Sequence, residues 1–305
     1  MHIDILGTES LGVRGLSCEV RTKHRHILID PGVALGYQRE GLLPHPVQVA
    51  AGEAIRQNIV NRLSRATDVV ISHFHGDHMP LADANPYQLS LHAVTGLLKR
   101  PRLWLKNLDE ETPHIAQRRD RLLSTLHRTI TACEGEEHDI LEFSGPMPHG
   151  FAHAPTGSVM MTRIRTESGI FVHGSDIQLL SDAPIQQILD WSATVVFLSG
   201  PPVYRRVPLD ELTRARVRAK TLADHVQTVI MDHHLLRCRE GIRWLDDLKT
   251  ETRGRILCAA DFMGARRRFL EARRAQLYAR FPVPDGWHEA YAAGRATTSG
   301  FQNSI

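Results

Sequence analysis

Four side chains that can bind a metal ion stand within six positions, at His73, His75, Asp77 and His78. Histidine nitrogens and carboxylate oxygens are good ligands for zinc and for neighbouring first-row metals. In a loop after a strand, the first two histidines can point the same way, while Asp77 and His78 turn towards a second centre. Four such residues directly after an apolar run are hard to explain as ordinary surface chemistry. The spacing therefore predicts a site for two metal ions.

This segment, HFHGDH, resembles the HxHxDH signature of the metallo-β-lactamase superfamily, and further matches follow in the family's order. They are LID-PG at Asp30, PHG at His149, HGSD at Asp176 and MDHH at 231–234. Together with GTESLGVRGLSC near the amino terminus, they look most similar to a little-characterised, mainly archaeal branch of predicted metal-dependent hydrolases. The resemblance covers roughly residues 1–265. It implies a two-metal hydrolase with the four-layer αββα sandwich of that superfamily.

The resemblance also implies a set of seven metal ligands. The first metal takes His73, His75 and His149, the second takes Asp77, His78 and His233, and Asp176 bridges the two. Three of these positions have alternatives. His153 lies close to His149, Asp176 could instead cap the segment that follows it, and His234 competes with its neighbour. Adjacent residues point in opposite directions if the strand continues, and the family pattern favours His233 over His234.

A metal pair of this kind implies hydrolysis by a bridging hydroxide, whose pKa the metals lower to about 7. Asp77 is the catalytic candidate, because its carboxylate could also position the nucleophile. Asp30, at the end of a strand, is expected to accept the free ring N–H of a ligand histidine and fix its tautomer. Tyr204 could supply a hydroxyl to the substrate, although a packed aromatic ring is the favoured interpretation. Zinc is the expected metal, with iron and manganese as alternatives, because the same ligands accept all three.

Apolar periodicity indicates which elements position these residues. Runs of strand length occur at 2–6, 16–20, 26–30, 67–73, 138–144, 159–166, 169–176, 194–200, 228–234 and 255–261, and helical spacing at 50–66, 183–191, 208–226 and 243–250. A helix thus leads into the strand whose carboxyl end carries the histidine motif, the usual place for a site in layered α/β folds. Two β-rich halves, each followed by helices, favour an αββα sandwich over a doubly wound sheet.

Two further segments are predicted to be helical. Leucine repeats in residues 80–135, broken by prolines, predict helices that cover one side of the site. The basic stretch at 264–281 predicts a helix whose arginines either recognise phosphate or form a solvated face. Phe269 and Leu270 interrupt the charge as in an amphipathic helix, which favours the solvated face. No repeat, low-complexity segment or linker divides the chain, so a single domain is expected over residues 1–305.

The composition indicates an ordinary globular protein. Lysines and arginines number 37 against 34 acids, so the formal charge of +3 gives no strong attraction to nucleic acid or an anionic membrane. The four cysteines are dispersed without CxxC spacing, which favours free thiols in a reducing compartment. The chain has neither a signal-like start nor an apolar run of about 18 residues. We therefore expect a cytoplasmic protein with no membrane partner.

The expected function is hydrolysis of an ester, lactone, amide or phosphodiester bond in a small-molecule substrate. Nuclease activity on nucleic acid is the first alternative, which the modest net charge disfavours. A di-iron oxidoreductase is the second, but flavin-partnered members of the superfamily commonly carry glutamate where this chain has His75. An inactive metal-binding scaffold is the third, and the complete ligand set argues against it. Exposed helices and the segment at 80–135 are compatible with a homodimer.

Overall fold

Two β-sheets form the centre of the computed structural model, which describes residues 1–107, 112–128, 130, 132–151 and 157–301. The first sheet has the strand order β1 (His2–Gly7), β2 (Ser17–Arg21), β3 (His26–Ile29), β4 (Asp68–Ile71) and β5 (Arg102–Leu105). The second has the order β14 (Ile256–Leu257), β13 (Thr228–Met231), β12 (Val195–Leu198), β11 (Gly169–Ser175), β10 (Thr162–Thr166), β7 (Leu141–Phe143) and β6 (Glu137–His138). Strands β3 to β5 and β11 to β14 run parallel within their sheets, and the other pairs are antiparallel.

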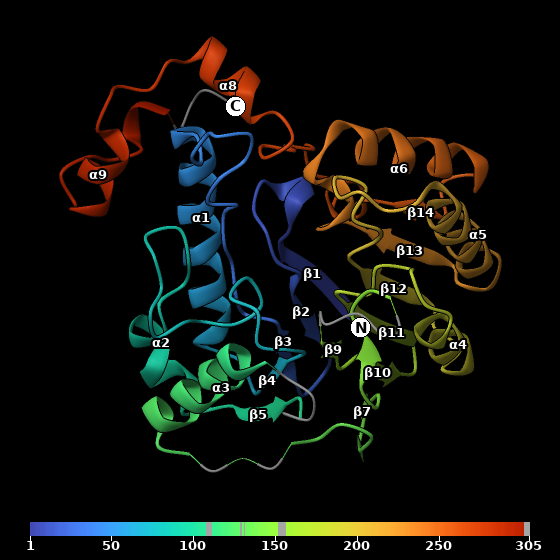
Figure 1. Cartoon of the computed structure of the whole chain (residues 1–305). Coiled ribbons are helices and arrows are strands. Elements are labelled where there is room, and N and C mark those ends of the chain that lie inside the picture. The colour runs from blue at the N-terminus through green and yellow to red at the C-terminus, as the bar shows by residue number, and fades with distance from the viewer. Residues whose placement is uncertain (108–111, 129, 131, 152–156, 302–305) are drawn as a thin grey trace.

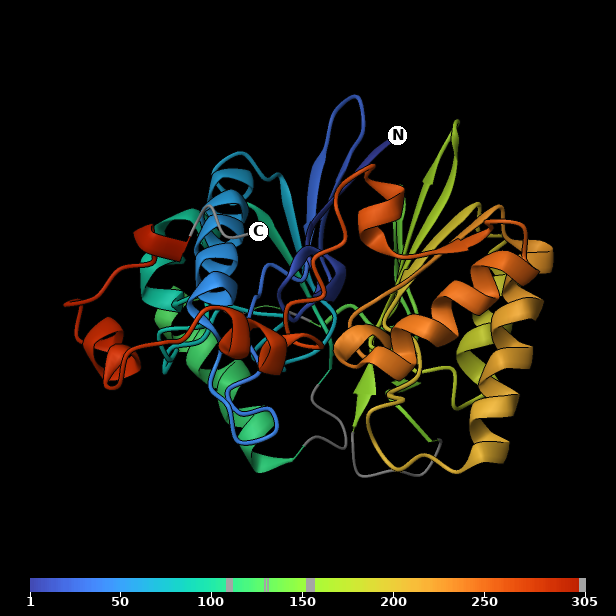
Figure 2. The same ribbon diagram turned by 90° about the horizontal axis from the view of Figure 1, so that it is seen from above.

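Helices cover the outer face of each sheet (Figure 1). The first sheet packs against α1 (Pro46–Leu63), α2 (Leu91–Leu98) and α3 (Pro113–Leu126). The second packs against α4 (Ala183–Asp190), α5 (Leu209–His225) and α6 (Arg239–Glu251). Figure 2 shows both sheets between these two helical layers. The arrangement is the four-layer αββα sandwich that the sequence predicts.

Successive side chains of a strand face opposite sides of the sheet, and in the central strands both sides are covered. These strands therefore appear in the sequence as unbroken apolar runs. In β4, Val69 and Ile71 pack towards the helices, whereas Val70 lies between the two sheets. In β13, Val229 and Met231 likewise pack under helices, and Ile230 lies between the sheets. A parallel strand with both faces covered buries every side chain, so a polar residue appears only where the strand ends. That rule places the polar histidine and aspartate motifs at the strand ends.

The segment at 80–135 contains the two predicted helices, α2 and α3, but also the strand β5 between them. Both helices lie on the outer face of the first sheet. One contact links α3 to the metal motif, because Arg118 Nη1 donates to the backbone oxygen of Phe74 at 3.3 Å. The two predicted helices are present, their role in covering the site stays a prediction, and the strand within the segment was missed.

The predicted basic helix at 264–281 is much shorter in the structure, where α8 spans only Arg274–Arg280. Phe269 has a φ of 45° and is buried, so the chain cannot be helical there. Arg267 is held by Asp261 at 2.5 Å, which ties the segment to the end of α7 (Ala259–Phe262). Buried side chains and ion pairs therefore replace the solvated helix face before Arg274. The chain then returns to α1 through α9 (Trp287–Ala292) and a 3₁₀ turn, η3 (Ser299–Phe301) (Figure 1).

Two predictions from composition can be compared with the coordinates. All four cysteines are buried and free, as the dispersed spacing predicts. Within the described ranges, no helix is both long enough and apolar enough to cross a membrane.

Candidate metal centre

The candidate site lies where strands of both sheets reach their carboxyl ends. Strand β4 ends at Ile71 and leads into the motif that begins at His73, and β11 is followed directly by Asp176. Strand β13 ends two residues before His233. A small hairpin of β8 (Met147–Pro148) and β9 (Ser158–Val159) supplies the adjacent His149. Parallel strands that end at one edge bring residues distant in sequence to a single place.

Asp176 is the centre of this cluster. Its Oδ2 lies 2.9 Å from His149 Nε2 and 3.7 Å from His73 Nε2. Its Oδ1 lies 3.4 Å from His78 Nε2 and 3.6 Å from His233 Nε2. One carboxylate therefore faces both groups of predicted ligands, as a bridging position requires.

The structure brings all seven predicted ligands together, and their role as ligands stays a prediction. Four groups among the described residues have ligand atoms within 4.8 Å of one another, and two of them together contain the seven predicted ligands: His73, His75, His149 and Asp176, and Asp77, His78 and His233. Asp77 Oδ2 lies 3.3 Å from His233 Nε2 in the second group. The other two are Asp30, His73 and His78, and Asp176, His233 and His234.

Buried atoms without hydrogen bonds show that this donor set fits metal ions. Within the described residues, His73 Nε2, His78 Nε2 and Asp176 Oδ1 are buried and have no hydrogen-bond partner. A buried polar atom left unsatisfied costs about 1–3 kcal/mol. All three atoms point into the cluster, where bound cations would use their lone pairs. The chemistry of the residues therefore matches a metal centre.

The protonation preferences of the predicted ligands differ, because burial of His78 is outweighed by Asp176 and Asp30, which raise the pKa of that ring well above its usual range. Burial lowers the pKa of His73, and it lowers the pKa of His75 to about 4. Burial opposes ionisation of Asp176, but the neighbouring histidines outweigh it and hold the pKa of that carboxyl well below its usual range. Neutral imidazole and ionised carboxylate are the forms that bind metals.

Asp30 has the supporting position that the sequence predicts. Its Oδ2 lies 2.8 Å from His78 Nδ1, which leaves Nε2 of that ring facing Asp176. The same carboxylate accepts from the backbone N–H of Ser72 at 2.8 Å and from the Ser72 hydroxyl at 2.7 Å. Asp30 therefore holds both the ring of His78 and the start of the motif loop.

The substitution Asp30→Asn is expected to weaken metal binding by about 10–100-fold. The amide supplies a single acceptor oxygen to three donors, so the ring of His78 loses its fixed orientation. Competition with a chromogenic chelator measures the affinity. Asp139→Asn is the control, because that side chain is 77% exposed. An affinity equal to that of the control would rule out the supporting role.

His233 and His234 both face the centre, contrary to the expectation that neighbours point apart. The strand stops at Met231 and His233 has a φ of 35°, so the alternation of an extended chain no longer applies. The His234 Nε2 lies 3.1 Å from Asp176 Oδ2. Both nitrogens of His233 meet donors, from the backbone N–H of Gly15 at 2.9 Å and from Arg237 Nη2 at 2.6 Å. A metal at His233 thus requires Arg237 to move, and His234 stays an alternative ligand.

Tyr204 lies at the outer side of the cluster. Its hydroxyl is 3.1 Å from His234 Nδ1 and accepts from Arg237 Nη1 at 3.2 Å. The ring is only partly buried and the hydroxyl is engaged with polar groups, and the choice between a substrate contact and a packed aromatic stays a prediction. Both predicted supporting residues, His234 and Tyr204, therefore adjoin the candidate ligands.

The sequence did not identify two charged residues of the site. Arg237 is positioned by a 3₁₀ turn, η2 (Leu235–Arg237), and its Nη2 lies 3.6 Å from Asp77 Oδ2. Asp232 is buried and accepts from Thr8, Ser10, His233 and Ala259. A carboxylate at the end of an apolar strand is a signal that could have revealed Asp232. Arginine is not a metal ligand, and nothing in the local pattern marks Arg237.

Gly32 permits the close approach of the motif loop. A Cβ at this position would lie 2.2 Å from Met79 N and 2.3 Å from His78 C, which are backbone atoms. Gly32→Ala is therefore expected to destabilise the protein by about 1–3 kcal/mol and to lower its metal content by displacing His78. Denaturant unfolding and elemental analysis measure the two effects. Gly96→Ala is the matched control, since nothing lies within 4 Å of a Cβ there. Equal behaviour of the two variants would contradict this account.

Comparison with known proteins gives full-length relatives. No protein-family model matches the chain. A UPF0282 protein of Methanosarcina mazei is 48% identical over 297 residues, covering 97% of this chain and 98% of its own. The UPF0282 protein of Methanopyrus kandleri is 31% identical, covering 91% of this chain and 99% of its own. That of Pyrococcus abyssi is 30% identical, covering 91% and 92%.

Solved structures give more distant similarities. An isothiocyanate hydrolase from Delia radicum gut bacteria is 15% identical, with a TM-score of 0.49, and the match covers 81% of this chain and 94% of that one. A metal-dependent hydrolase of the β-lactamase superfamily is 15% identical, with a TM-score of 0.49 and coverages of 82% and 92%. A dizinc quorum-quenching lactonase is 16% identical, with a TM-score of 0.35 and coverages of 72% and 72%.

Proposed function

The chain belongs to the UPF0282 family, and from its own candidate centre we propose that it is a two-metal hydrolase. The substrate is a small molecule, and the bond that is cleaved is an ester, lactone, amide or phosphodiester. The observation that carries this proposal is the convergence of six potential ligands around a seventh, Asp176. Buried ring nitrogens without hydrogen bonds support it.

In this proposal, each of two groups of ligands binds one metal ion. His73, His75 and His149 would hold one ion, Asp77, His78 and His233 would hold the other, and Asp176 would serve both. When bound, the two ions supply a water nucleophile of lowered pKa and polarise the bond to be cleaved. Zinc suits this mixture of imidazole and carboxylate ligands, and iron or manganese would also be accepted.

Asp77 is the residue that we assign to orienting the nucleophile. Its side chain is 19% exposed, whereas that of Asp176 is 2% exposed, so Asp77 can also reach water. Its Oδ2 lies 3.3 Å from His233 Nε2, which keeps the carboxylate beside the second group of ligands. A carboxylate held in this way can accept a hydrogen bond from water and direct it towards the substrate.

We assign Tyr204 to binding of the substrate. Its hydroxyl adjoins His234, which in turn faces Asp176 Oδ2. The hydroxyl can therefore donate a hydrogen bond to a substrate that binds over the centre, while Arg237 holds the oxygen.

Metal content and activity of one sample test the proposal. Protein purified without added metal is subjected to elemental analysis and then assayed against phosphodiester, lactone and thioester substrates, before and after loading with zinc, manganese or iron. We expect about two ions per chain and hydrolysis of at least one substrate class. Absence of bound metal under every loading condition would refute the mechanism. Redox-active iron with oxygen consumption would assign the centre to an oxidoreductase instead.

His75→Ala provides the matching variant. Loss of one imidazole from the first group is expected to remove at least one ion per chain and the hydrolytic activity with it. His92→Ala is the control, because His92 is an exposed histidine on α2. If His75→Ala retained the metal content and activity of the control, the chain would be a scaffold and the proposal would fail.

A further inference from the structure

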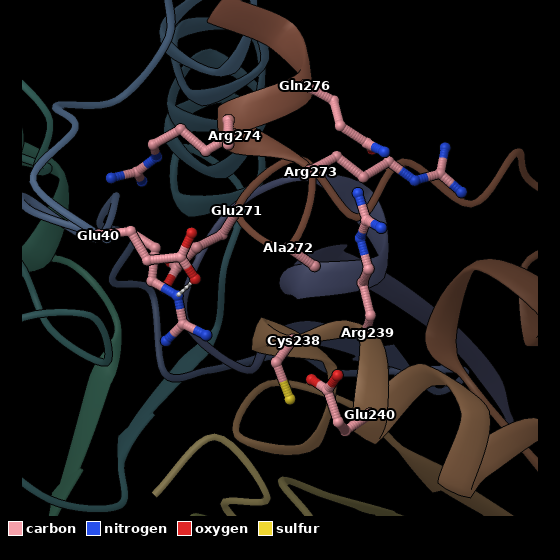
Figure 3. Close-up of a pocket in the computed structure, with 11 residues that line it drawn as sticks. Glu40, Cys238, Arg239, Glu240, Glu271, Ala272, Arg273, Arg274 and Gln276 are labelled. Carbon is pink, nitrogen blue, oxygen red and sulfur yellow. Dashed lines mark ion pairs between the residues drawn. The ribbon is translucent and has the colours of Figure 1, made fainter.

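A concave region near the candidate centre is lined by arginines (Figure 3). The cavity has a volume of about 210 Å³, and its walls include Arg39, Arg239, Arg273 and Arg274. An adjoining hollow of about 530 Å³ shares Arg239 and Arg273 in its walls. We call the two together the arginine groove. The larger hollow is in the range of small-molecule sites, about 300–1,000 Å³.

The carboxylates of the groove are already engaged by other arginines. Glu271 binds Arg14, at 2.6 Å, and Glu240 binds Arg243, at 3.1 Å. Glu40 lies at the longer distance of 4.0 Å from Arg39 Nε.

Arg239 and Arg273 are without an acidic partner among the residues that the structure describes. Their side chains come from different segments, α6 and the turn before α8, and Arg239 extends towards Arg273 in Figure 3. Two like charges held near each other repel, and a shared anion removes that repulsion.

Arg274 adds a buried positive charge to the wall. The residue is 1% exposed, and its Nε has no hydrogen-bond partner within the described residues. Its other nitrogens donate to neutral oxygens, those of Leu42 and the Gln48 side chain, each at 3.0 Å. Burial disfavours this charge, and the carboxylate of Glu271 in the same wall partly offsets that cost.

We propose that the arginine groove is a binding subsite for the phosphate group of a small-molecule ligand. Two guanidinium forks on separate segments suit an anion with at least three oxygens, whereas a carboxylate has two oxygens and satisfies one fork. Exposed Arg239 and Arg273 bind the phosphate, whereas the buried side chain of Arg274 extends away from them in Figure 3.

The groove and the candidate centre are separated by residues that contact both. Arg39 stacks over the ring of Tyr204 at 5.3 Å, and the Tyr204 hydroxyl bonds His234. Cys238 of the groove directly follows Arg237, which contacts His233. A ligand anchored in the groove could therefore extend towards the metals, and its identity as substrate rests on the proposed function. Phosphate binding itself does not depend on that function.

Titration of the native protein with inorganic phosphate, followed by calorimetry, tests the subsite. The variant Arg239→Ala/Arg273→Ala is expected to weaken binding by at least about tenfold, the effect of one lost hydrogen bond to a charged group. Arg266→Ala/Arg295→Ala removes the same charge from exposed positions outside the groove walls. Asp176→Asn alters the metal centre and leaves the groove intact. Both of these variants should bind phosphate as the native protein does.

Each other result overturns the subsite. Loss of binding in Asp176→Asn alone would place the phosphate at the metals. Equal weakening in both double-arginine variants would show that only overall charge matters, and no binding by the native protein would refute the proposal directly. If a single-stranded oligonucleotide binds through Arg239 and Arg273 while free phosphate does not, a nucleic-acid ligand replaces the small molecule. Since these outcomes are read from binding, they are independent of whether hydrolysis is found.

Discussion

Asp176→Asn should remove metal from both positions at once and lower hydrolytic activity by more than about 100-fold. Even the loss of a residue that only supports a metal ligand costs about 10–100-fold, so loss of a bridging ligand must cost more. The two oxygens of this carboxylate face different groups, since Oδ2 is 2.9 Å from His149 and Oδ1 is 3.4 Å from His78. An amide is neutral and offers a single acceptor oxygen, which weakens both groups together.

The number of metal ions lost distinguishes a carboxylate that bridges two ions from a ligand that binds only one ion. Elemental analysis of Asp176→Asn is expected to give fewer than about one ion per chain, whereas His75→Ala should retain the ion held by the other group. The control is the unfolding of native protein and variant after both have been treated with a chelator. A folding defect in the variant would appear as a lower stability even without metal. Loss of only one ion in Asp176→Asn would show that the carboxylate serves one group, and the bridge would be excluded.

The metal motif could be predicted from sequence because its geometry is local. Four candidate ligands occupy His73 to His78 directly after β4, so a strand followed by a loop is enough to bring them together. Asp176 and His233 could be placed because each also follows a buried strand of the second sheet. Alternating burial in those strands makes the polar residue at the end visible against the apolar run.

Contacts between distant segments could not be predicted in the same way. Arg237 reaches His233 only because a 3₁₀ turn follows the strand, and no period in the sequence reports that turn. The residues before α8 read as an amphipathic helix, yet Glu271 is drawn into a buried pair with Arg14, which is 257 positions away. A pairing of that kind outweighs local helix propensity, which is worth less than about 1 kcal/mol per residue.

The arginines of that same segment show where an interpretation from the local sequence pattern fails. The sequence favoured a solvated helix face for Arg273 and Arg274, with phosphate recognition as the alternative. In the structure Arg274 is buried and Arg273 lines the groove, so the helix on which the favoured interpretation depended is absent before Arg274. Recognition of phosphate, the alternative interpretation, depends on which segments of the chain lie next to each other. Only the three-dimensional structure shows which segments these are.

Asp68→Asn is expected to destabilise the protein by about 3–5 kcal/mol, the cost of removing one partner of a buried ion pair. Asp68 begins β4, and its side chain is fully buried against Arg25, whose Nη2 is 2.6 Å away. Trp104 and Thr67 donate to the same carboxylate, at 3.0 and 2.7 Å. Asp139→Asn is the matched control, because Asp139 contacts the same arginine at 3.4 Å but is 77% exposed. Denaturant unfolding should show a small change for the control, about 1 kcal/mol or less.

Lowering the pH should reduce the difference in unfolding free energy between the native protein and Asp68→Asn. Burial opposes ionisation of Asp68, but hydrogen bonds from Arg25, Thr67 and Trp104 outweigh it and lower the pKa of the carboxyl. A lowered pKa in the folded state stabilises the protein above the unfolded value of about 3.9, and this contribution is lost as the pH falls through the folded pKa. The gap in unfolding free energy should therefore be constant near neutral pH and shrink below about pH 4. Since the pair lies at the opposite end of β4 from the metal motif, the folded variant should keep its metal content. Metal loss in step with stability would show that the two ends of the strand are coupled.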